Sequence, residues 1–494
     1  MVFDEMMNPY DLIAEMIAHI SHLDAFYYNS RTYRDAVQVE EMTEAARMFL
    51  ESQPFFSGKR TEEITEAIIN KGIPLELAEA IRAWDKFDQF FYALELLQLL
   101  ESFYSWEAVI KSPFVRLQME NTFESLNTNV DQTKVLILPK VPSLSDSITP
   151  EDDAQKKTGY YWKIGVNEEL KNLYYVNVEE LNRAGIKYKI VHQILDVGFF
   201  GDKDYLRIAM SPIVKADLLT VEHYTRSSES ITSGLFSVNE TLKDPRLVNQ
   251  KICAAIGLAA ENNADILVFP EMLGTEQIED DTDEGSLLKQ IAQQLEDEGK
   301  AMPYLVVGPS RWNNNKNRLS LFDASGKRIA IQEKQHPFLH KDSNDLEDLL
   351  DIRREIRVLH IPRIGRLSFP ICVDYLNDSY MQLLAVDMRS TLLICPSYSF
   401  GKRHFNLASR SCVKYDCYTV WLNTCAAFAE AELPDYIGLV SGPFVKKDVQ
   451  LIQPKCAGVC KDSAAGCVFL LQVNMDKENP GIVSQKHFFD GKVS

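Results

Sequence analysis

The feature that most constrains the fold is a series of short, continuous apolar runs that begins near residue 203. The segment "DPRLVNQKICAAIGLAAENNA" separates the first two runs and places Leu247, Ile252, Ala255 and Ile256 on one helical face. Continuous apolar strands that alternate with helical patterns are typical of α/β domains whose sheets are covered by helices. We therefore expect an α/β domain over residues 203–480. The apolar runs are "DYLRIAMSP", "DILVFPEML", "MPYLVVGPSRW", "GRLSFPICVDY", "TLLICPSYSF" and "CYTVWLNTC".

Residues 1–127 have a helical pattern and predict a separate N-terminal domain. "PYDLIAEMIAHISHLDAF" places apolar residues three and four apart, as an amphipathic helix requires. "TEEITEAIINKG" has capping residues for a helix, with Thr61 at its start and Gly72 after its end. "ELAEAIRAWDKFDQFFYALELLQLLESFYSW" predicts one long helix.

Two further segments complete the expected organisation. Residues 128–202 contain "TKVLILP", "LYYVNV" and "IKYKIVHQILDVGFF", which are rich in β-branched and aromatic residues. Such runs favour strands, so this part predicts a small β-containing connector. Residues 481–494 are expected to form a C-terminal tail.

The charge and the cysteine content restrict the class of protein. A formal net charge of −19 argues against direct binding to nucleic acid or to an anionic membrane, because both require basic surface. The acidic N-terminus is broken by Pro9 and lacks the pattern of a signal peptide, and no apolar run is long enough to cross a bilayer. Nine cysteines, an odd number, indicate reduced thiols. We expect a cytoplasmic protein.

Three of the predicted strands end in reactive side chains. "ILVFPE" ends at Glu271, "AIQEK" at Lys334 and "SFPIC" at Cys372. In α/β folds the strand ends commonly carry the functional groups, since the loops there vary over a rigid scaffold. A carboxylate can take the proton of a thiol, and an ammonium group can stabilise the thiolate and a later oxyanion. Together these three side chains predict an acyl-transfer site.

The same motifs, in the same order, resemble those of the nitrilase-like carbon–nitrogen hydrolases. The resemblance runs from about Tyr205 to Asp476 and includes "ADILVFPEML", "RLSLFDASGKRIAIQEKQHPF", "GRLSFPICVDY" and "AAGCVFLLQVNMDK". It implies a nitrilase-like αββα sandwich, here preceded by a mainly helical N-terminal domain with a small β segment. It also implies a homo-oligomer.

The family mechanism assigns a role to each residue of the trio. Glu271 would be the base, Cys372 the nucleophile, and Lys334 would hold the oxyanion together with the backbone N–H after the nucleophile, that of Val373. The substrate would be a small amide, nitrile or carbamoyl compound, hydrolysed through a thioester without a metal or a cofactor. Further candidates for the pocket are Asp374, His336, which shapes the loop beside the lysine, and Asn423.

The sequence departs from the family pattern around the predicted nucleophile. Pro370 lies two residues before Cys372, and Val373 and Tyr375 flank Asp374 in place of the commoner residues. Many family members have a second glutamate soon after the lysine, and here either Asp342 or Glu347 could take that place. These departures concern the substrate more than the class of reaction.

A different kind of function is also compatible with the sequence. A nitrilase-like fold could serve as a binding or assembly module, in a regulatory or defence-associated complex, with the N-terminal region binding a protein partner. "DSYMQLLAVDMRS" would then present Met381, Leu384 and Met388 at an interface, although the same residues fit packing against a sheet.

The remaining cysteines allow a metal site as a further alternative. Cys456, Cys460 and Cys467, with His487, could bind zinc, but their spacing is poor for such a site. Cys412 and Cys417 lie on a predicted helix and are expected to be core thiols.

Overall fold

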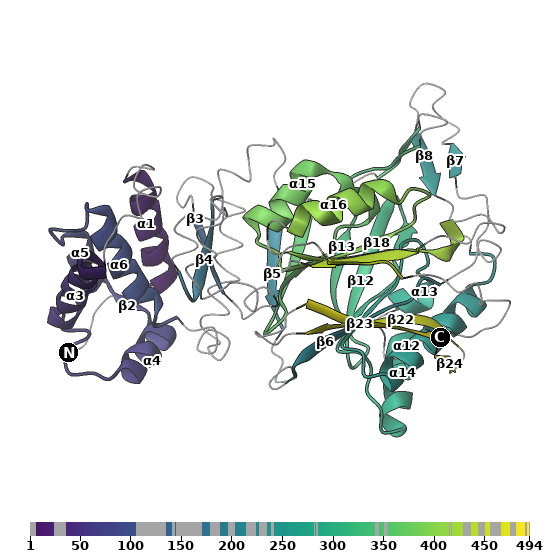
Figure 1. Cartoon of the computed structure of the whole chain (residues 1–494), viewed down its shortest axis with the longest axis horizontal. Helices are drawn as coiled ribbons and strands as arrows, with labels where there is room; N and C mark the ends of the chain where they lie inside the picture. The colour runs from purple at the N-terminus through teal and green to yellow at the C-terminus, as the bar shows by residue number, and fades with distance from the viewer. Residues whose placement is uncertain are drawn as a thin grey trace. The chain divides into compact units, whose positions relative to one another are not determined.

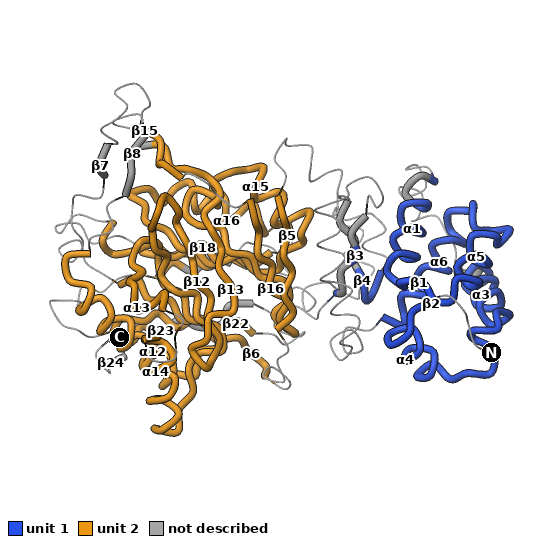
Figure 2. Tube along the Cα trace, turned by 180° about the vertical axis from the view of Figure 1, so that it is seen from behind, with its two compact units in different colours: residues 1–142, 150–187 blue, residues 143–149, 188–494 orange. Residues whose placement is uncertain are grey.

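The chain forms two compact units in a computed structural model. Unit 1 comprises residues 1–142 and 150–187, and unit 2 comprises residues 143–149 and 188–494 (Figure 2). Each unit is described separately. The structure describes residues 6–23, 36–104, 135–140, 144, 170–177, 188–195, 203–213, 224–226, 235–238, 242–280, 282, 285–340, 345–349, 354–413, 415, 417–427, 436–442, 450–454, 466–474, 481–489 and 492–493.

Unit 1 contains mainly helices in its described part. Asn8 caps the first helix by accepting a hydrogen bond from the N–H of Tyr10, and Pro9 occupies the first helical position. The buried carboxylate of Glu101 accepts hydrogen bonds from the backbone N–H groups of residues 171–173 and so joins the last helix to a strand. The elements are β1 (Met6–Met7), α1 (Pro9–His22), α3 (Ala36–Ser52), α4 (Thr61–Lys71), β2 (Ile73–Pro74), α5 (Leu75–Arg82), α6 (Phe90–Glu101), β3 (Val135–Pro139) and β4 (Leu173–Asn177).

The single long helix predicted after residue 75 is wrong, because α5 and α6 are separated by turns. Trp84, between them, stacks on Phe49 of α3 with ring centroids 4.9 Å apart and meets Tyr92 of α6 edge-on. This aromatic packing outweighs the helix propensity of the segment. The capping contact of α4 also differs from the prediction at Thr61: the N–H of Arg60 donates to Glu63 at 3.0 Å.

Unit 2 is a mixed α/β structure built on two large sheets. The first has nine strands, and its interior strands β6 and β9 are parallel to each other while β22 runs antiparallel to β6. In order, its strands are β11 (Arg311–Asn313), β12 (Lys316–Asp323), β10 (Leu305–Val307), β9 (Ile266–Val268), β6 (Tyr205–Met210), β22 (Cys467–Asn474), β23 (Gly481–Phe489) and β24 (Lys492–Val493), with β13 (Arg328–Glu333) paired to β12.

The second large sheet has seven strands, and a small four-stranded sheet accompanies it. The four strands are β14 (Leu339–His340), β15 (Asp345–Glu347), β8 (Leu235–Val238) and β7 (Tyr224–Arg226). The seven are β21 (Gln450–Ile452), β20 (Gly438–Gly442), β19 (Tyr418–Asn423), β18 (Leu392–Ser397), β17 (Gly365–Ser368), β16 (Glu355–Ile361) and β5 (Lys189–Ile194).

Helices cover the outer faces of the two large sheets and produce four layers (Figure 1). Helices α12 (Pro245–Glu261) and α14 (Leu287–Asp297) lie on the nine-stranded sheet, whereas α15 (Asp378–Gln382) and α16 (Arg403–Val413) lie on the seven-stranded sheet. Shorter helices are α13 (Glu276–Glu279), the 3₁₀ helices η6 (Cys372–Leu376) and η8 (Cys425–Ala427), and the π-helix η7 (Leu383–Asp387).

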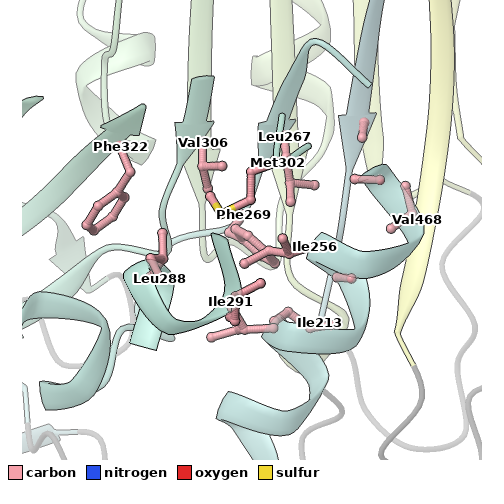
Figure 3. Packing of buried hydrophobic residues seen from close by; sticks show 14 of the residues in the cluster. Ile213, Ile256, Leu267, Phe269, Leu288, Ile291, Met302, Val306, Phe322 and Val468 are labelled. Carbon is pink, nitrogen blue, oxygen red and sulfur yellow. The ribbon is translucent and has the colours of Figure 1, made fainter. Parts of the chain in front are cut away.

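A hydrophobic core fills the space between α12, α14 and the nine-stranded sheet (Figure 3). Ile256 of α12 and Leu288 of α14 face Leu267, Phe269 and the neighbouring strand residues, and all are almost fully buried. This packing anchors β9, and therefore the residues that follow it. Burial of apolar area is the main stabilising contribution here.

Two of the predicted segment boundaries differ from the structure. Strand β5, predicted within the connector, pairs in parallel with β16 and belongs to unit 2. Residues 481–489, predicted as part of a tail, form β23 and pair with β22. The partner of β5 lies more than one hundred residues later in the sequence, whereas the partner of β23 is the strand just before it. The alternation of apolar and polar residues within a strand does not identify either partner.

The proposed interface residues and the core thiols have the following positions. Leu384 and Met388 are fully buried, which supports packing against the sheet, and Met381 is half-buried. Cys412 and Cys417 are buried as expected, but Cys417 precedes β19 and does not lie on the helix.

Within the described residues, no helix combines the length and apolarity needed to span a membrane.

Two adjacent substitutions on α12 test this core. Ile256→Ala removes a fully buried side chain and should lower the free energy of unfolding by about 2–4 kcal/mol. Gly257→Ala adds a Cβ that has no heavy atom within 4 Å, and it should raise stability by about 0.5–1 kcal/mol because glycine weakens a helix interior. Urea unfolding followed by circular dichroism measures both, and equal effects of the two substitutions would contradict the packing described.

Candidate active site

The three strand-end residues predicted from the sequence lie together in unit 2. The Nζ atom of Lys334, directly after β13, donates to Oε1 of Glu271 at 3.0 Å. The thiol of Cys372, at the start of η6, donates to the backbone carbonyl of Tyr398 at 3.7 Å and lies close enough to Glu271 for the carboxylate to raise its pKa. The three side chains come from different strands, and their residues are only 2%, 3% and 6% exposed for Glu271, Lys334 and Cys372. Glu271 therefore lies between a thiol and an ammonium group.

The carboxylate of Glu271 is held in one orientation by two further donors. Nδ2 of Asn317 donates to Oε1 at 2.7 Å, and the backbone N–H of Tyr398 donates to Oε2 at 2.8 Å. Asn317 also accepts the N–H of Lys334 through its backbone carbonyl. Neither residue was predicted. Asn317 could have been selected as a polar residue on β12, the strand that pairs with β13 just before Lys334.

Cys372 adopts an uncommon backbone conformation at the start of η6. Its φ is +49°, in the left-handed region that residues with a Cβ rarely occupy. Burial raises the pKa of the thiol well above its ordinary value, and the negative charge of Glu271 raises it further, whereas Lys334 lowers it. The resting thiol is therefore protonated at neutral pH and donates to the backbone carbonyl of Tyr398. Strain of this kind is often found at functional sites.

Lys334 is charged despite its burial. Burial alone would lower its pKa, but the neighbouring Glu271, Glu347 and Cys372 raise it well above its ordinary value. Nζ of Lys334 donates to Oε2 of Glu347 at 2.8 Å as well as to Glu271. The ammonium group thus bridges two carboxyl groups.

Glu347 is the second acidic residue of the site. Its Oε2 also accepts the N–H of Phe338 at 2.9 Å, and its residue is 4% exposed. Burial raises the pKa of Glu347, Lys334 lowers it and Glu271 raises it. The other candidate for this place, Asp342, lies outside the described residues.

Asp374 and His336 contact each other next to Lys334 and Cys372. The carboxylate of Asp374 accepts the backbone N–H groups of Gln335, His336 and Ile371 at 2.7–3.2 Å. Nδ1 of His336 lies 2.9 Å from the same carboxylate. Because these partners occupy the carboxylate, Asp374 ties the segment after Lys334 to the turn that carries Cys372. Both residues position the trio.

Asn423 and Val373, the other two candidates, have different environments. Asn423 is fully buried, and its side chain bonds to the backbone N–H and carbonyl of Ser399. It therefore stabilises the loop that carries Tyr398, and its place in the pocket stays a prediction. Val373 is half-buried and follows Cys372 in η6, where a helix leaves its first N–H groups without acceptors from its own turn.

An apolar cluster lies beside the carboxyl groups and was not predicted. Trp312 packs against Met272, Phe338 and Leu349. Met272 directly follows Glu271 in the chain, and Leu349 lies shortly after Glu347. Trp312 lies opposite Asn317 on the paired strands β11 and β12. Nε1 of Trp312 and Oδ1 of Asn317 are buried without a hydrogen-bond partner. A donor and an acceptor are thus both unused near the trio.

The alternative zinc site is only half within the described residues. Sγ of Cys467 lies 3.1 Å from Nε2 of His487 on the paired strands β22 and β23. Cys456 and Cys460 lie outside the described residues. In the part of the chain that the structure describes, no group of three or more His, Cys, Asp or Glu side chains could hold a metal ion. The seven cysteines in that part form no disulfide bond.

Comparison with known proteins gives weak likenesses. No family model matches the chain, and no curated protein matches it. Among solved structures, an amidase from Nesterenkonia sp. is similar at 16% identity and a TM-score of 0.36, over 56% of this chain and 93% of that one.

Two further solved structures have similar scores. A glutamine-dependent NAD⁺ synthetase from Acinetobacter baumannii is similar at 12% identity and a TM-score of 0.35, over 57% of this chain and 48% of that one. The NitFhit protein of C. elegans is similar at 16% identity and a TM-score of 0.35, over 55% and 61%. Likeness at this level does not assign the chain to a family.

The pH dependence of Cys372 alkylation tests the electrostatics of the site. With a raised pKa, the alkylation rate should be low at neutral pH and still increase above pH ~9, later than for an ordinary thiol of pKa ~8.5. Glu271→Gln removes the nearby negative charge, so the profile should move to lower pH. Lys334→Met removes the positive charge, so it should move to higher pH.

Mass mapping after brief exposure to iodoacetamide measures the rate at each pH. Glu276→Gln, which removes an exposed carboxylate of α13, is the control and should leave the profile unchanged. A profile that does not move in Glu271→Gln would mean that Glu271 does not share the proton of the thiol.

Proposed function

We propose that unit 2 is a thiol-dependent hydrolase of non-peptide carbon–nitrogen bonds, acting on a small amide, nitrile or carbamoyl compound. The observation that carries the proposal is the buried carboxylate of Glu271, which accepts a hydrogen bond from the Lys334 ammonium group and lies beside the Cys372 thiol, whose pKa it raises. The resemblance of the sequence motifs to nitrilase-like hydrolases supports the same reaction class.

The first half of the reaction, for an amide, forms a thioester. Glu271 takes the proton of the thiol as Sγ of Cys372 attacks the carbonyl carbon. The oxyanion that forms is stabilised by the ammonium group of Lys334 and by the N–H of Val373. Collapse of the tetrahedral intermediate breaks the C–N bond, and the protonated Glu271 gives its proton to the leaving amine or ammonia.

The second half releases the acid and restores the enzyme. Glu271, again a carboxylate, takes a proton from a water molecule, which attacks the thioester carbon. The C–S bond breaks, the carboxylic acid leaves, and Glu271 returns the proton to the thiolate of Cys372. Every proton thus passes through one carboxylate, so the two bonds that fix its orientation serve both halves of the cycle.

Glu347 provides a second carboxyl group for the buried ammonium group of Lys334. Nζ of Lys334 donates to both Glu347 and Glu271, so its positive charge is shared between two carboxyl groups. Two carboxyl groups around one cation also limit the cost of burying the charges.

The surroundings indicate the size and polarity of the substrate. The trio is at most 6% exposed, which favours a small molecule over a protein. The apolar side chains around Trp312 fit an apolar acyl group. Nε1 of Trp312 and Oδ1 of Asn317 can donate to and accept from one polar group on it, such as a second amide.

A second candidate function is a binding or assembly module without turnover. The observation that favours it is the same near-complete burial of the trio, together with the raised pKa of the Cys372 thiol. In that case unit 1 would bind a protein partner and the chain would form a homo-oligomer, with the pocket retaining a metabolite.

Release of ammonia or amine from a panel of small amides, carbamoyl compounds and nitriles tests the proposed function. Cys372→Ala should reduce turnover by about 10³-fold or more, since removal of a nucleophile leaves only the residual effect of binding and the oxyanion site. Cys412→Ala, which removes another buried thiol of unit 2, should retain most of the activity.

Circular dichroism establishes that both variants are folded. Turnover that survives in Cys372→Ala would eliminate the proposed nucleophile. If the natural chain turns over no member of the panel while Cys372 can still be alkylated, the result would favour the binding module.

A further inference from the structure

Unit 2 has a cavity of about 400 Å³ that is separate from the trio. It lies between strands of the two large sheets: β12 and β13 of the nine-stranded sheet and β16 of the seven-stranded sheet. Residues 329–331 give it an apolar wall, and its charged lining comprises Arg318, Arg328, Glu333, Glu355 and Arg357. A volume of this size is within the range of about 300–1,000 Å³ that is usual for small-molecule sites.

Among the described residues that line the cavity, three arginines accompany two glutamates. Glu333 is shared between Arg318 and Lys316, whose nitrogen atoms lie 3.4 Å and 3.9 Å from its Oε1. Glu355 is shared between Arg357 and Lys189. Each glutamate therefore has a basic partner in the lining and a second one outside it.

Arg328 lies at the other end of the cavity. Its Nη1 donates to the backbone carbonyl of Glu279 at 2.8 Å, and Asp280 lies within electrostatic range of it. Arg328 and Glu333 lie at opposite ends of β13, about 17 Å apart along an extended strand, and the basic groups are therefore spread along the cavity.

Arg357 provides a donor that the protein does not use. Its Nε atom is buried and has no hydrogen-bond partner, although the side chain is 26% exposed overall. A guanidinium group presents a planar set of N–H donors that matches carboxylate and phosphate oxygens. Buried donors are nearly always satisfied in folded proteins, so an acceptor from a ligand fits this place.

We propose that this cavity binds a small organic anion through its phosphate or carboxylate groups. Arg357 and Arg318 hold an anionic group at one end, and Arg328 holds the other end of the molecule. The apolar part of the ligand contacts residues 329–331. The site is distinct from the proposed catalytic trio, and its occupation does not depend on turnover.

The wall of the cavity is bonded to the segment that carries Lys334. The backbone carbonyl of Glu355 accepts hydrogen bonds from Nε2 of Gln332 at 3.0 Å and from Nε2 of Gln335 at 3.3 Å. Gln332 also accepts the N–H of Arg357. An anion bound to Arg357 therefore stabilises residues 328–335 and 354–357 against local opening, and their amide hydrogen exchange should slow.

Thermal unfolding of the full chain with two probes, inorganic phosphate and glutarate, tests the proposal. Potassium chloride keeps the ionic strength constant. At least one probe should raise the melting temperature in a saturable manner and slow exchange in residues 328–335 and 354–357, with no change in unit 1. A response to phosphate alone assigns a phosphorylated ligand, and a response to glutarate alone assigns a carboxylate.

Arg357→Gln should weaken the apparent affinity for the effective probe by at least tenfold, whereas Arg328→Gln, at the other end of the cavity, should change the affinity for such a short probe much less. Arg246→Gln, on the exposed face of α12, is the matched control and should bind normally. Arg357→Lys keeps the charge and removes the planar donor set, so it provides a folded variant of intermediate affinity if Arg357→Gln is unstable. No saturable response to either probe, or equal responses in all variants, would overturn the proposal.

Discussion

The site depends on one buried carboxylate, that of Glu271, and on the three donors that hold it. Lys334, Asn317 and the backbone of Tyr398 hydrogen-bond to it, and the thiol of Cys372 lies beside it. A buried charge is costly unless it is paired and hydrogen-bonded, so these donors are a condition of the fold as well as of the chemistry. The same bonds determine the direction in which Glu271 can take a proton.

These donors come from both large sheets, which makes the site a product of the packing between them. Glu271, Asn317 and Lys334 follow or belong to strands β9, β12 and β13, whereas Cys372 and Tyr398 follow β17 and β18 of the other sheet. Asp374 fastens the two sides, because its carboxylate holds the backbone of both the Lys334 segment and the Cys372 turn. The core under α12 and α14 keeps β9 in place beneath them.

The sequence is informative about residues at strand ends and less so about contacts between strands. Glu271, Lys334 and Cys372 could be selected because each follows an apolar run, and the structure brings them together. Asn317 and Trp312 could not, since their roles arise from pairing between β11, β12 and β13. A buried polar residue at a strand end, such as Asn423, can stabilise a neighbouring loop as well as line a pocket, and the sequence does not distinguish the two. Strands β5 and β23 were assigned to a connector and a tail because their partners lie in other segments.

The most direct test of the account is to trap the thioester on Cys372. The full chain is acid-quenched during turnover of the best amide in the panel, digested, and mapped by mass spectrometry. The account predicts an added mass equal to the acyl group on the peptide that contains Cys372, removed by hydroxylamine and absent in Cys372→Ala. Turnover with no adduct at Cys372, or with the adduct on another residue, would contradict it.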